Sequence, residues 1–434
     1  MAFTTLPGVD GAPTTFQGTE GADSIAIVGT DANALAFGSF VAQGEAGNDT
    51  INYSGTRTDS TIRGGQGDDL ITQNIVGNGF LATSFVAGNI GNDTIGNASL
   101  GIAATLSTLQ GGQGEDRIFA GTIQSTLVAG NLGADYLSVN DQFGFVSVDS
   151  SSIWGGQGDD IIEVTTSFQD STVTNTSIAG NIGDDVINLD VFGSFAGSVA
   201  DGGDGQDLID ATLSSSNLSL IGGTGDDTIF GGSGEDSVQG NDDDDWLAGS
   251  DGADVVDGGR GNDLITGSFY DGNVYDGDFT GDILSGGTGT NRFVIRDGSS
   301  GGFPFFNDLD GNGLITTGDS ITTDLAGTAD VITDWNSGTV NTLDTGISGL
   351  LSFNGFGNFM SLGFGIFNGI EQNNAVRGSY DDSTGNFFID VLGSDIAVWS
   401  SEFAFGFVQN NVTILDGTGI NFNTTITEGT FVTV

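Results

Sequence analysis

A six-residue phrase that opens with glycine and closes with aspartate recurs fourteen times between residues 18 and 263. Representative copies are GTEGAD at Gly18, GGQGDD at Gly64 and GNIGDD at Gly180. Two residues after each closing aspartate stands an aliphatic residue, so each polar phrase leads into an apolar strand position. Self-similarity at a short period is typical of repeat architectures, in which stacked units bury a continuous core. The sequence therefore predicts a stack of polar loops and short strands.

The phrase resembles the RTX (repeat-in-toxin) nonapeptide, G-G-x-G-x-D-x-U-x, and the resemblance covers most of residues 18–267. The family implies an all-β fold, a right-handed parallel β-roll or β-solenoid, with each Ca²⁺ between an aspartate of one turn and carbonyls of the neighbouring turn. The calcium ligands implied in this way are the closing aspartates: Asp23, Asp49, Asp69, Asp93, Asp116, Asp135, Asp160, Asp185, Asp207, Asp227, Asp236, Asp245, Asp254 and Asp263. On the order of a dozen ions are expected.

The residues of the phrase have a physical interpretation of their own. Glycine at the first, second and fourth places allows the positive φ angles of a sharp turn and exposes backbone carbonyls. The phrase at Gly240, GNDDDD, departs from the pattern because Asp243 stands where the fourth-place glycine is expected. The alternative is a metal-free β-solenoid whose aspartates only hydrogen-bond their own turns.

Composition excludes several classes of protein. The chain has 58 acidic and 7 basic residues and a net charge of −51, which excludes a nucleic-acid binder. The absence of Lys, His and Cys removes the usual general bases, thiol nucleophiles and zinc ligands. We therefore predict that the protein is not an enzyme, although catalysis by carboxylates alone is not excluded. Uncompensated carboxylates call for a hard cation, with Ca²⁺ the first candidate and Mg²⁺ the second.

The spacing of the phrases predicts two kinds of coil. The last five copies, from Gly222 to Gly258, are nine residues apart, so consecutive loops should alternate between the two edges of the roll. Earlier copies are 19 to 26 residues apart, so only one edge should bind calcium there. Four residues before the phrase, hydroxyl residues are expected to point outward: Ser60, Ser84, Ser107, Thr126, Ser151, Thr176 and Ser198. Two residues before it, aliphatic residues are expected to point inward: Ile62, Val86, Leu109, Val128, Ile153, Ile178 and Ala200.

A second calcium motif follows the repeats. Residues 308–319 fit the D-x-[DN]-x-[DN]-G loop and resemble an EF-hand or dockerin-type loop with aspartate instead of glutamate at the twelfth place. The resemblance implies side-chain ligands from Asp308, Asp310, Asn312 and Asp319 and a carbonyl ligand from Leu314. An Asx-rich turn without metal is the alternative.

These features divide the chain into five segments. They are an N-terminal lead (1–17), a long-period roll (18–221), a nonapeptide roll (222–267), degenerate repeats (268–300) and a C-terminal β cap (301–434). The cap resembles the region that follows RTX rolls and includes a tail that the family implies is a type I secretion signal. No Sec signal peptide and no transmembrane segment are expected.

The function favoured by these features is that of a non-catalytic, extracellular, calcium-binding structural protein. The chain resembles RTX proteins of bacterial S-layers and cyanobacterial surface coats, which implies calcium-dependent assembly with copies of itself into a layer, filament or matrix. Cell-surface polysaccharide and the type I secretion machinery are the other expected partners. The alternative function is a secreted adhesin or carbohydrate-binding module.

Overall fold

The computed structural model describes residues 4–6, 14–27, 39–74, 80–99, 101–140, 147–166, 170–267 and 282–294, and ten strands beyond residue 300. Throughout these residues the regular elements are β-strands, and none forms a helix that is long and apolar enough to cross a membrane. The chain divides into two compact units, residues 1–224 and 225–434. The expected all-β fold with parallel coils is confirmed.

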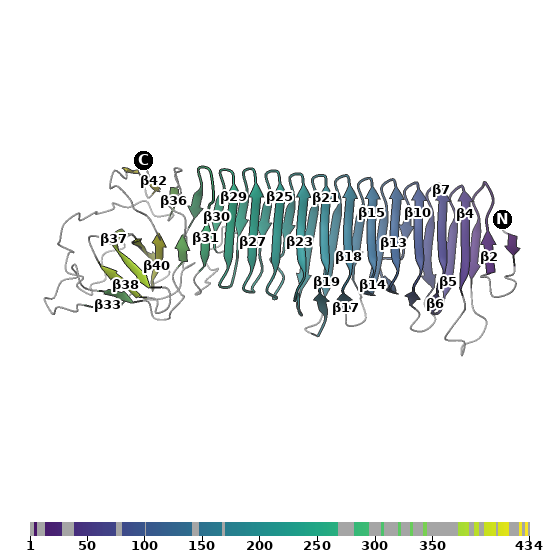
Figure 1. The fold of residues 1–434 in the computed structure, drawn as a ribbon, viewed down its shortest axis with the longest axis horizontal. Coiled ribbons are helices and arrows are strands. Elements are labelled where there is room, and N and C mark those ends of the chain that lie inside the picture. Colours follow the sequence, from purple (N-terminus) through teal and green to yellow (C-terminus); the bar gives the residue numbers. More distant parts are fainter. Residues whose placement is uncertain are drawn as a thin grey trace. The chain divides into compact units, whose positions relative to one another are not determined.

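Residues 1–224 form a parallel β-solenoid, in which each coil crosses one sheet, turns at a glycine-rich loop and returns along a second sheet (Figure 1). The first sheet pairs its strands in parallel in this order: β2 (Thr14–Gln17), β4 (Phe40–Ala46), β7 (Thr61–Gln66), β10 (Phe85–Ile90), β13 (Thr108–Gln113), β15 (Leu127–Leu132), β18 (Ser152–Gln157), β21 (Ser177–Ile182), β23 (Val199–Asp204) and β25 (Ser219–Thr224). The strand β1 (Thr4–Leu6) pairs with β2 in the antiparallel direction.

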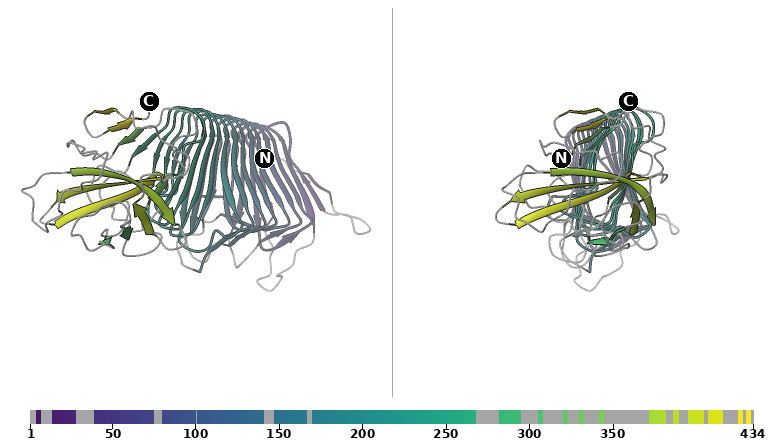
Figure 2. Two further views of the ribbon diagram at one scale, coloured as in Figure 1. Left: turned by 60° about the vertical axis from the view of Figure 1, so that its left-hand side comes forward. Right: turned by 90° about the vertical axis from the view of Figure 1, so that its left-hand side faces the viewer.

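The second sheet of this unit receives the chain after each loop. Its strands are β3 (Ser24–Ile27), β5 (Thr50–Ser54), β8 (Leu70–Asn74), β11 (Thr94–Ile95), β14 (Arg117–Gln124), β16 (Tyr136–Val139), β19 (Ile161–Thr166), β22 (Val186–Val191) and β24 (Leu208–Asp210). Short strands then lead to the opposite edge: β6 (Arg57–Thr58), β9 (Leu81–Ala82), β12 (Ile102–Thr105), β17 (Ser147–Asp149) and β20 (Thr172–Thr174). Figure 2 shows these coils one behind another.

The core lies between the two sheets because strand residues alternate between the two faces of a sheet. Val86 lies opposite Ile62 and Leu109 in the parallel register, so equivalent aliphatic residues stack from coil to coil. The inward aliphatic positions predicted before each phrase are all fully buried, which confirms that expectation. The outward position predicted for the hydroxyl residues is wrong, because all seven are buried. They lie in the turn before the strand, where the side chain points into the edge of the coil.

The unit of residues 225–434 begins with shorter coils. One sheet pairs β27 (Ser237–Asp242), β29 (Val255–Arg260), β31 (Ile283–Ser285) and β35 (Asp330–Ile332) in parallel. The other pairs β26 (Thr228–Phe230), β28 (Trp246–Ala248), β30 (Leu264–Thr266), β32 (Arg292–Val294) and β36 (Thr342–Asp344). Roll strands thus continue through the segment 268–300, where the sequence pattern decays, and into the segment assigned to the cap.

The remaining strands of this unit form an antiparallel sheet and a hairpin. The sheet contains β33 (Phe305–Asn307), β34 (Ser320–Thr322), β37 (Gln372–Asp381), β38 (Asn386–Ile389), β39 (Asp395–Ala404) and β40 (Phe407–Leu415). The hairpin consists of β41 (Thr425–Thr427) and β42 (Thr430–Val432). Parallel pairing of β35 with β40 and antiparallel pairing of β36 with β42 join both to the short coils.

Candidate metal centre

Each phrase forms the loop that joins a strand of the first sheet to a strand of the second. In the loop of Gly88 to Asp93, the second residue, Asn89, has φ 87° and the fourth, Gly91, has φ 129°. Equivalent positive angles recur at the second and fourth places of most loops, as the glycine pattern predicts. Asparagine at the second place tolerates this region better than most residues with a Cβ. The two left-handed residues turn the chain back sharply between the two strands.

The first glycine has a different role from the one expected. Gly88 does not have a positive φ. A Cβ at Gly88 would instead lie 2.1 Å from Oδ2 of Asp93, the closing residue of the same loop. The first place is therefore glycine because the carboxylate packs directly against its Cα, and the expectation of a positive φ there is wrong.

The closing aspartates of the first unit form one column along one edge. In each step the backbone N–H of one aspartate donates to Oδ1 of the aspartate in the next coil, at 2.7–2.8 Å. The order along the column is Asp23, Asp49, Asp69, Asp93, Asp116, Asp135, Asp160, Asp185 and Asp207. The predicted single aspartate edge of the long coils is thus observed.

The second carboxylate oxygen is the unusual feature of this column. Oδ2 has no hydrogen-bond partner in seven consecutive members, although the side chains are almost completely buried: Asp49, Asp69, Asp93, Asp116, Asp135, Asp160 and Asp185. A buried carboxylate oxygen without a hydrogen bond lowers the stability of the folded state by on the order of 1–3 kcal/mol or more. Oδ2 of Asp23 differs, because the N–H of Thr19 donates to it at 2.6 Å and the hydroxyl of Thr19 at 2.8 Å.

A carbonyl oxygen from the next coil converges on the same place. The position that a Cβ on Gly44 would occupy is 2.2 Å from Oδ2 of Asp49 and 2.2 Å from the carbonyl oxygen of Gly64, so these two oxygens are at most twice that distance apart. The loop of Gly130 repeats the arrangement with Asp135 and Gly155. Oxygens that converge without a donor between them repel one another, whereas a hard cation would bind both.

Burial shifts the ionisation of these carboxylates. Desolvation raises the pKa of Asp93, Asp135 and Asp185 to about 7 and that of Asp160 to about 8, against an ordinary value of 3.8. The N–H donated from the preceding coil lowers the pKa of each but only partly offsets burial, and charges on neighbouring aspartates raise the pKa further. Without a cation, the column therefore holds protons near neutral pH.

The opposite edge of the long coils carries a neutral ladder. The backbone N–H of each turn residue donates to the hydroxyl oxygen of the next coil at 3.0–3.5 Å, in the order Ser60, Ser84, Ser107, Thr126, Ser151, Thr176 and Ser198. Each hydroxyl up to Thr176 also donates to the carbonyl two residues before it. A hydroxyl can accept and donate at once, so this edge is satisfied without a charge and without an ion.

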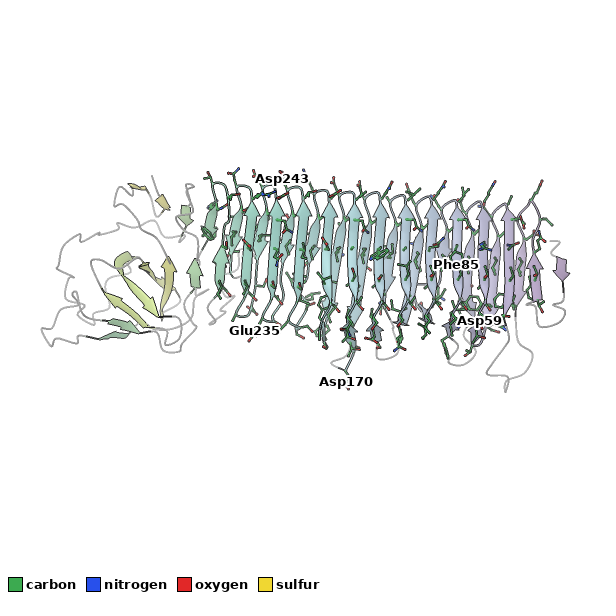
Figure 3. All side chains as sticks on the ribbon, viewed as in Figure 1. Asp59, Phe85, Asp170, Glu235 and Asp243 are labelled. Carbon is green, nitrogen blue, oxygen red and sulfur yellow. The ribbon has the colours of Figure 1, made fainter. Side chains whose placement is uncertain are left out.

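The short coils of residues 225–434 have an aspartate column at each edge, as the nine-residue spacing predicts. One column runs from Asp227 through Asp245 and Asp263 to Asn291, and the other from Asp236 through Asp254 to Asp282. Figure 3 shows Asp243 and Glu235, from consecutive loops, at opposite edges. Oδ2 of Asp245 is buried without a hydrogen bond, like its counterparts in the first unit.

Asp282 is a member that the sequence search missed. It closes a loop opened by Gly267, because a Cβ on Gly267 would lie 1.8 Å from Oδ2 of Asp282, and the residues inserted between them break the nine-residue spacing. The sequence Asp282-Ile283-Leu284 could have revealed this loop, because an aliphatic residue stands two positions after the aspartate, as in the other copies.

No three or more acidic side chains gather at one point in the described parts of the chain. The closing position of each loop supplies one buried carboxylate, so the further ligands beside it would be backbone carbonyls. The second calcium motif, with Asp308, Asp310, Asn312, Leu314 and Asp319, lies outside the described residues.

Asp243 occupies the fourth place of its loop with φ 82°, the left-handed conformation that glycine adopts in the other loops. A residue with a Cβ is strained there, so Asp243→Gly is expected to raise the free energy of unfolding by about 1 kcal/mol in calcium. Urea unfolding followed by circular dichroism measures this. Asp243→Ala is the control, because it removes the same charge, keeps a Cβ and lacks the tolerance of asparagine for this conformation. Equal stabilisation by both variants would mean that charge, and not the backbone, is the cause.

The chain forms stacked parallel coils, and a glycine-rich loop with a buried aspartate closes each coil. These features define the class of calcium-type parallel β-rolls. The family model described as RTX calcium-binding nonapeptide repeat (4 copies) matches residues 43–72, 107–122, 149–164, 219–247 and 239–269. These matches support the RTX family for the repeats, and RTX repeats bind calcium. These matches indicate no catalytic family. Among curated proteins, none matches the chain.

Proposed function

We propose that the protein is a secreted, calcium-binding structural protein whose coils are held together by Ca²⁺ and which assembles with copies of itself at the cell surface. The calcium part of the proposal rests on one observation. Over the first glycine of a loop, a carboxylate oxygen that has no hydrogen bond lies near a carbonyl oxygen of the next coil. Asp49 with Gly64 and Asp135 with Gly155 are the clearest cases. The proposed ligands are the closing aspartates, with Asp282 added.

Calcium would supply the positive charge that this chain lacks. The aspartate holds the loop in two ways, since Oδ1 accepts an N–H from the preceding coil and Oδ2 is left for the ion. A carbonyl of the following coil joins Oδ2 at the ion, so each ion would tie two coils together. Ion binding and coil stacking are then one process, which suits a protein exported unfolded into a calcium-rich medium.

A row of exposed aliphatic residues on the aspartate edge supports assembly. Ile90, Leu132 and Ile182 are 46%, 42% and 50% exposed and stand at the third place of every second loop from Gly88 to Gly180. The loops between them carry exposed glutamines, Gln113 and Gln157, in the same register. At two coils per step the row repeats at roughly 9.6 Å. Such a row is matched best by a surface with the same period, which a second copy of this chain presents.

Lateral contacts are favoured over end-to-end growth at the start of the roll. The strand β1 pairs antiparallel with β2 and covers the outer edge of the first parallel strand of the first sheet. A covered edge is a poor template for another strand. We therefore expect side-by-side association of copies.

Negative-stain electron microscopy, in millimolar calcium and in excess chelator, tests the proposal. Sheets, tubes or filaments are expected only in calcium. The triple variant Ile90→Gln, Leu132→Gln, Ile182→Gln, which gives these loops the glutamine of their neighbours, is expected to bind the same amount of calcium and to remain as single particles. Because these side chains are already about half buried in a single copy, their loss would weaken each lateral contact by on the order of 1 kcal/mol per side chain.

Leu106→Gln with Leu213→Gln is the matched control. These leucines are 61% and 67% exposed, more than the residues of the row, so general surface hydrophobicity would make them at least as important. Assemblies that survive the triple variant would contradict the proposed contact. Single particles of the wild-type chain in both conditions would contradict self-assembly itself.

Trp154 favours the second candidate, an adhesin or carbohydrate-binding module. It is 41% exposed on the outer face of the first sheet and pairs with Ala129 and Ala179 on either side, so its ring stands beside small neighbours. A flat exposed aromatic ring with a polar edge suits an amphipathic ligand such as a sugar. This candidate would be supported if single particles bind cell-surface polysaccharide and the Trp154→Ala variant does not. Export by type I secretion remains a prediction for both.

A further inference from the structure

The column that contains Asp227, Asp245 and Asp263 reaches Asn291, which has a different chemistry. Asn291 is completely buried, and its Oδ1 accepts the N–H of Asp263 at 2.9 Å, so it takes the same place in the ladder as an aspartate. Its Nδ2 donates to the carbonyl oxygen of Gly286, the first residue of its own loop, at 2.7 Å. Oδ1 therefore pairs with the neighbouring coil and Nδ2 with its own loop.

The amide nitrogen stands where other loops place the unpaired carboxylate oxygen. A Cβ on Gly286 would lie 2.4 Å from Nδ2 of Asn291, and a Cβ on Gly240 would lie 2.1 Å from Oδ2 of Asp245. The two loops therefore place atoms of opposite hydrogen-bonding character at nearly the same position over the first glycine. Nδ2 carries hydrogens that the glycine carbonyl accepts, whereas Oδ2 carries only lone pairs.

We infer that the loop from Gly286 to Asn291 is closed by the Asn291 amide and takes no ion, so that the closing residue decides between an ion and an internal hydrogen bond. The inference rests on the proposed calcium function for the aspartate loops. It gives this column a coil that stays closed when calcium is removed. It also predicts that asparagine at an aspartate position creates a loop that needs no ion.

Two reciprocal variants of the full-length protein test the inference. Asn291→Asp replaces the donor with a carboxylate oxygen and is expected to bind one more calcium per chain and to unfold at a lower urea concentration in chelator. Asp245→Asn keeps Oδ1 for the N–H of Asp227 and adds a donor beside Gly240. It is expected to bind one calcium fewer and to unfold at a higher urea concentration in chelator. Equilibrium dialysis with elemental analysis counts the ions, and circular dichroism follows unfolding.

Asp245→Ala is the matched control, because it removes the carboxylate that accepts the N–H of Asp227 and provides no amide in its place. It should bind one calcium fewer and unfold earlier than Asp245→Asn in chelator. The inference is overturned if the two variants unfold alike in chelator, or if Asn291→Asp changes neither the ion count nor the midpoint. If the wild-type chain binds no calcium, the proposed function fails, yet the midpoints in chelator still test the amide closure by themselves.

Discussion

Removal of calcium at pH 8.5 is expected to unfold the long coils of residues 1–224. Seven consecutive buried aspartates there have an Oδ2 without a donor, and neighbouring coils are about 4.8 Å apart. Two unit charges at that separation repel by roughly 3.5 kcal/mol at an effective dielectric constant of about 20. The repulsion summed over six neighbouring pairs exceeds the roughly 5–15 kcal/mol by which most folded domains are stable. The ionised column is therefore incompatible with stacked coils unless cations neutralise it.

Far-UV circular dichroism during calcium titration of the chelated protein measures this effect. We expect a weak β signal in chelator and a cooperative gain of signal as calcium is added, because each ion fixes two coils. Sodium chloride at the same ionic strength is the control and should restore little, since buried charges are screened poorly. Magnesium should also restore less than calcium, because it requires near-octahedral geometry and keeps its water. An equal β signal with and without chelator would show that the coils do not need the ion.

Acidification is expected to replace calcium in part. The pKa values of Asp93, Asp135 and Asp185 are raised to about 7 and that of Asp160 to about 8, chiefly by desolvation. Between roughly pH 4 and pH 8, the folded state therefore holds protons that the unfolded chain has released. The free energy of unfolding of the calcium-free protein must then fall as pH rises. A protonated carboxyl can also donate to a carbonyl, as the amide of Asn291 does.

Urea unfolding in chelator at pH 5 and pH 8.5 measures this dependence. In chelator we expect a measurable unfolding midpoint at pH 5 and little folded signal left to lose at pH 8.5. In calcium we expect the higher midpoint at pH 8.5, because the ion needs the deprotonated ligand. Asp160→Asn should reduce the pH dependence in chelator, since it removes the carboxyl whose pKa is raised most among the four. A chelated protein that is more stable at pH 8.5 would contradict the assignment of these shifts to buried aspartates in the folded state.

Loop position and core were predictable because they depend on residues close together in sequence. The step from Asp69 to Ile71 places a polar loop next to a buried strand position, and period-2 alternation places Ile62 inward. The spacing of the phrases also predicted one aspartate edge in long coils and two in short ones. All of these follow from the lengths of turns and strands, which are local properties.

The parts that were missed depend on contacts between coils or within a loop in three dimensions. Ser84 was expected to face outward, yet it is buried because its hydroxyl accepts the N–H of Ser60 from a residue 24 positions away. The first glycine was assigned a positive φ, but its contact with the carboxylate is visible only in space. Asp282 was missed because an insertion hides the loop that it closes.

Periodicity alone predicts that this chain folds into stacked β coils with aspartates at regular places, because it decides which residues enter the core and which enter the turns. The chemistry of each edge, in contrast, depends on contacts that form only in the folded coils. Whether a buried side chain needs an ion depends on its hydrogen bonds within its own coil: Oδ2 of Asp135 has no donor, whereas the Ser84 hydroxyl and Nδ2 of Asn291 donate to carbonyls of their own coil. Each of the three side chains also accepts an N–H from a residue one coil away, at separations that differ from coil to coil, and no local pattern records that contact.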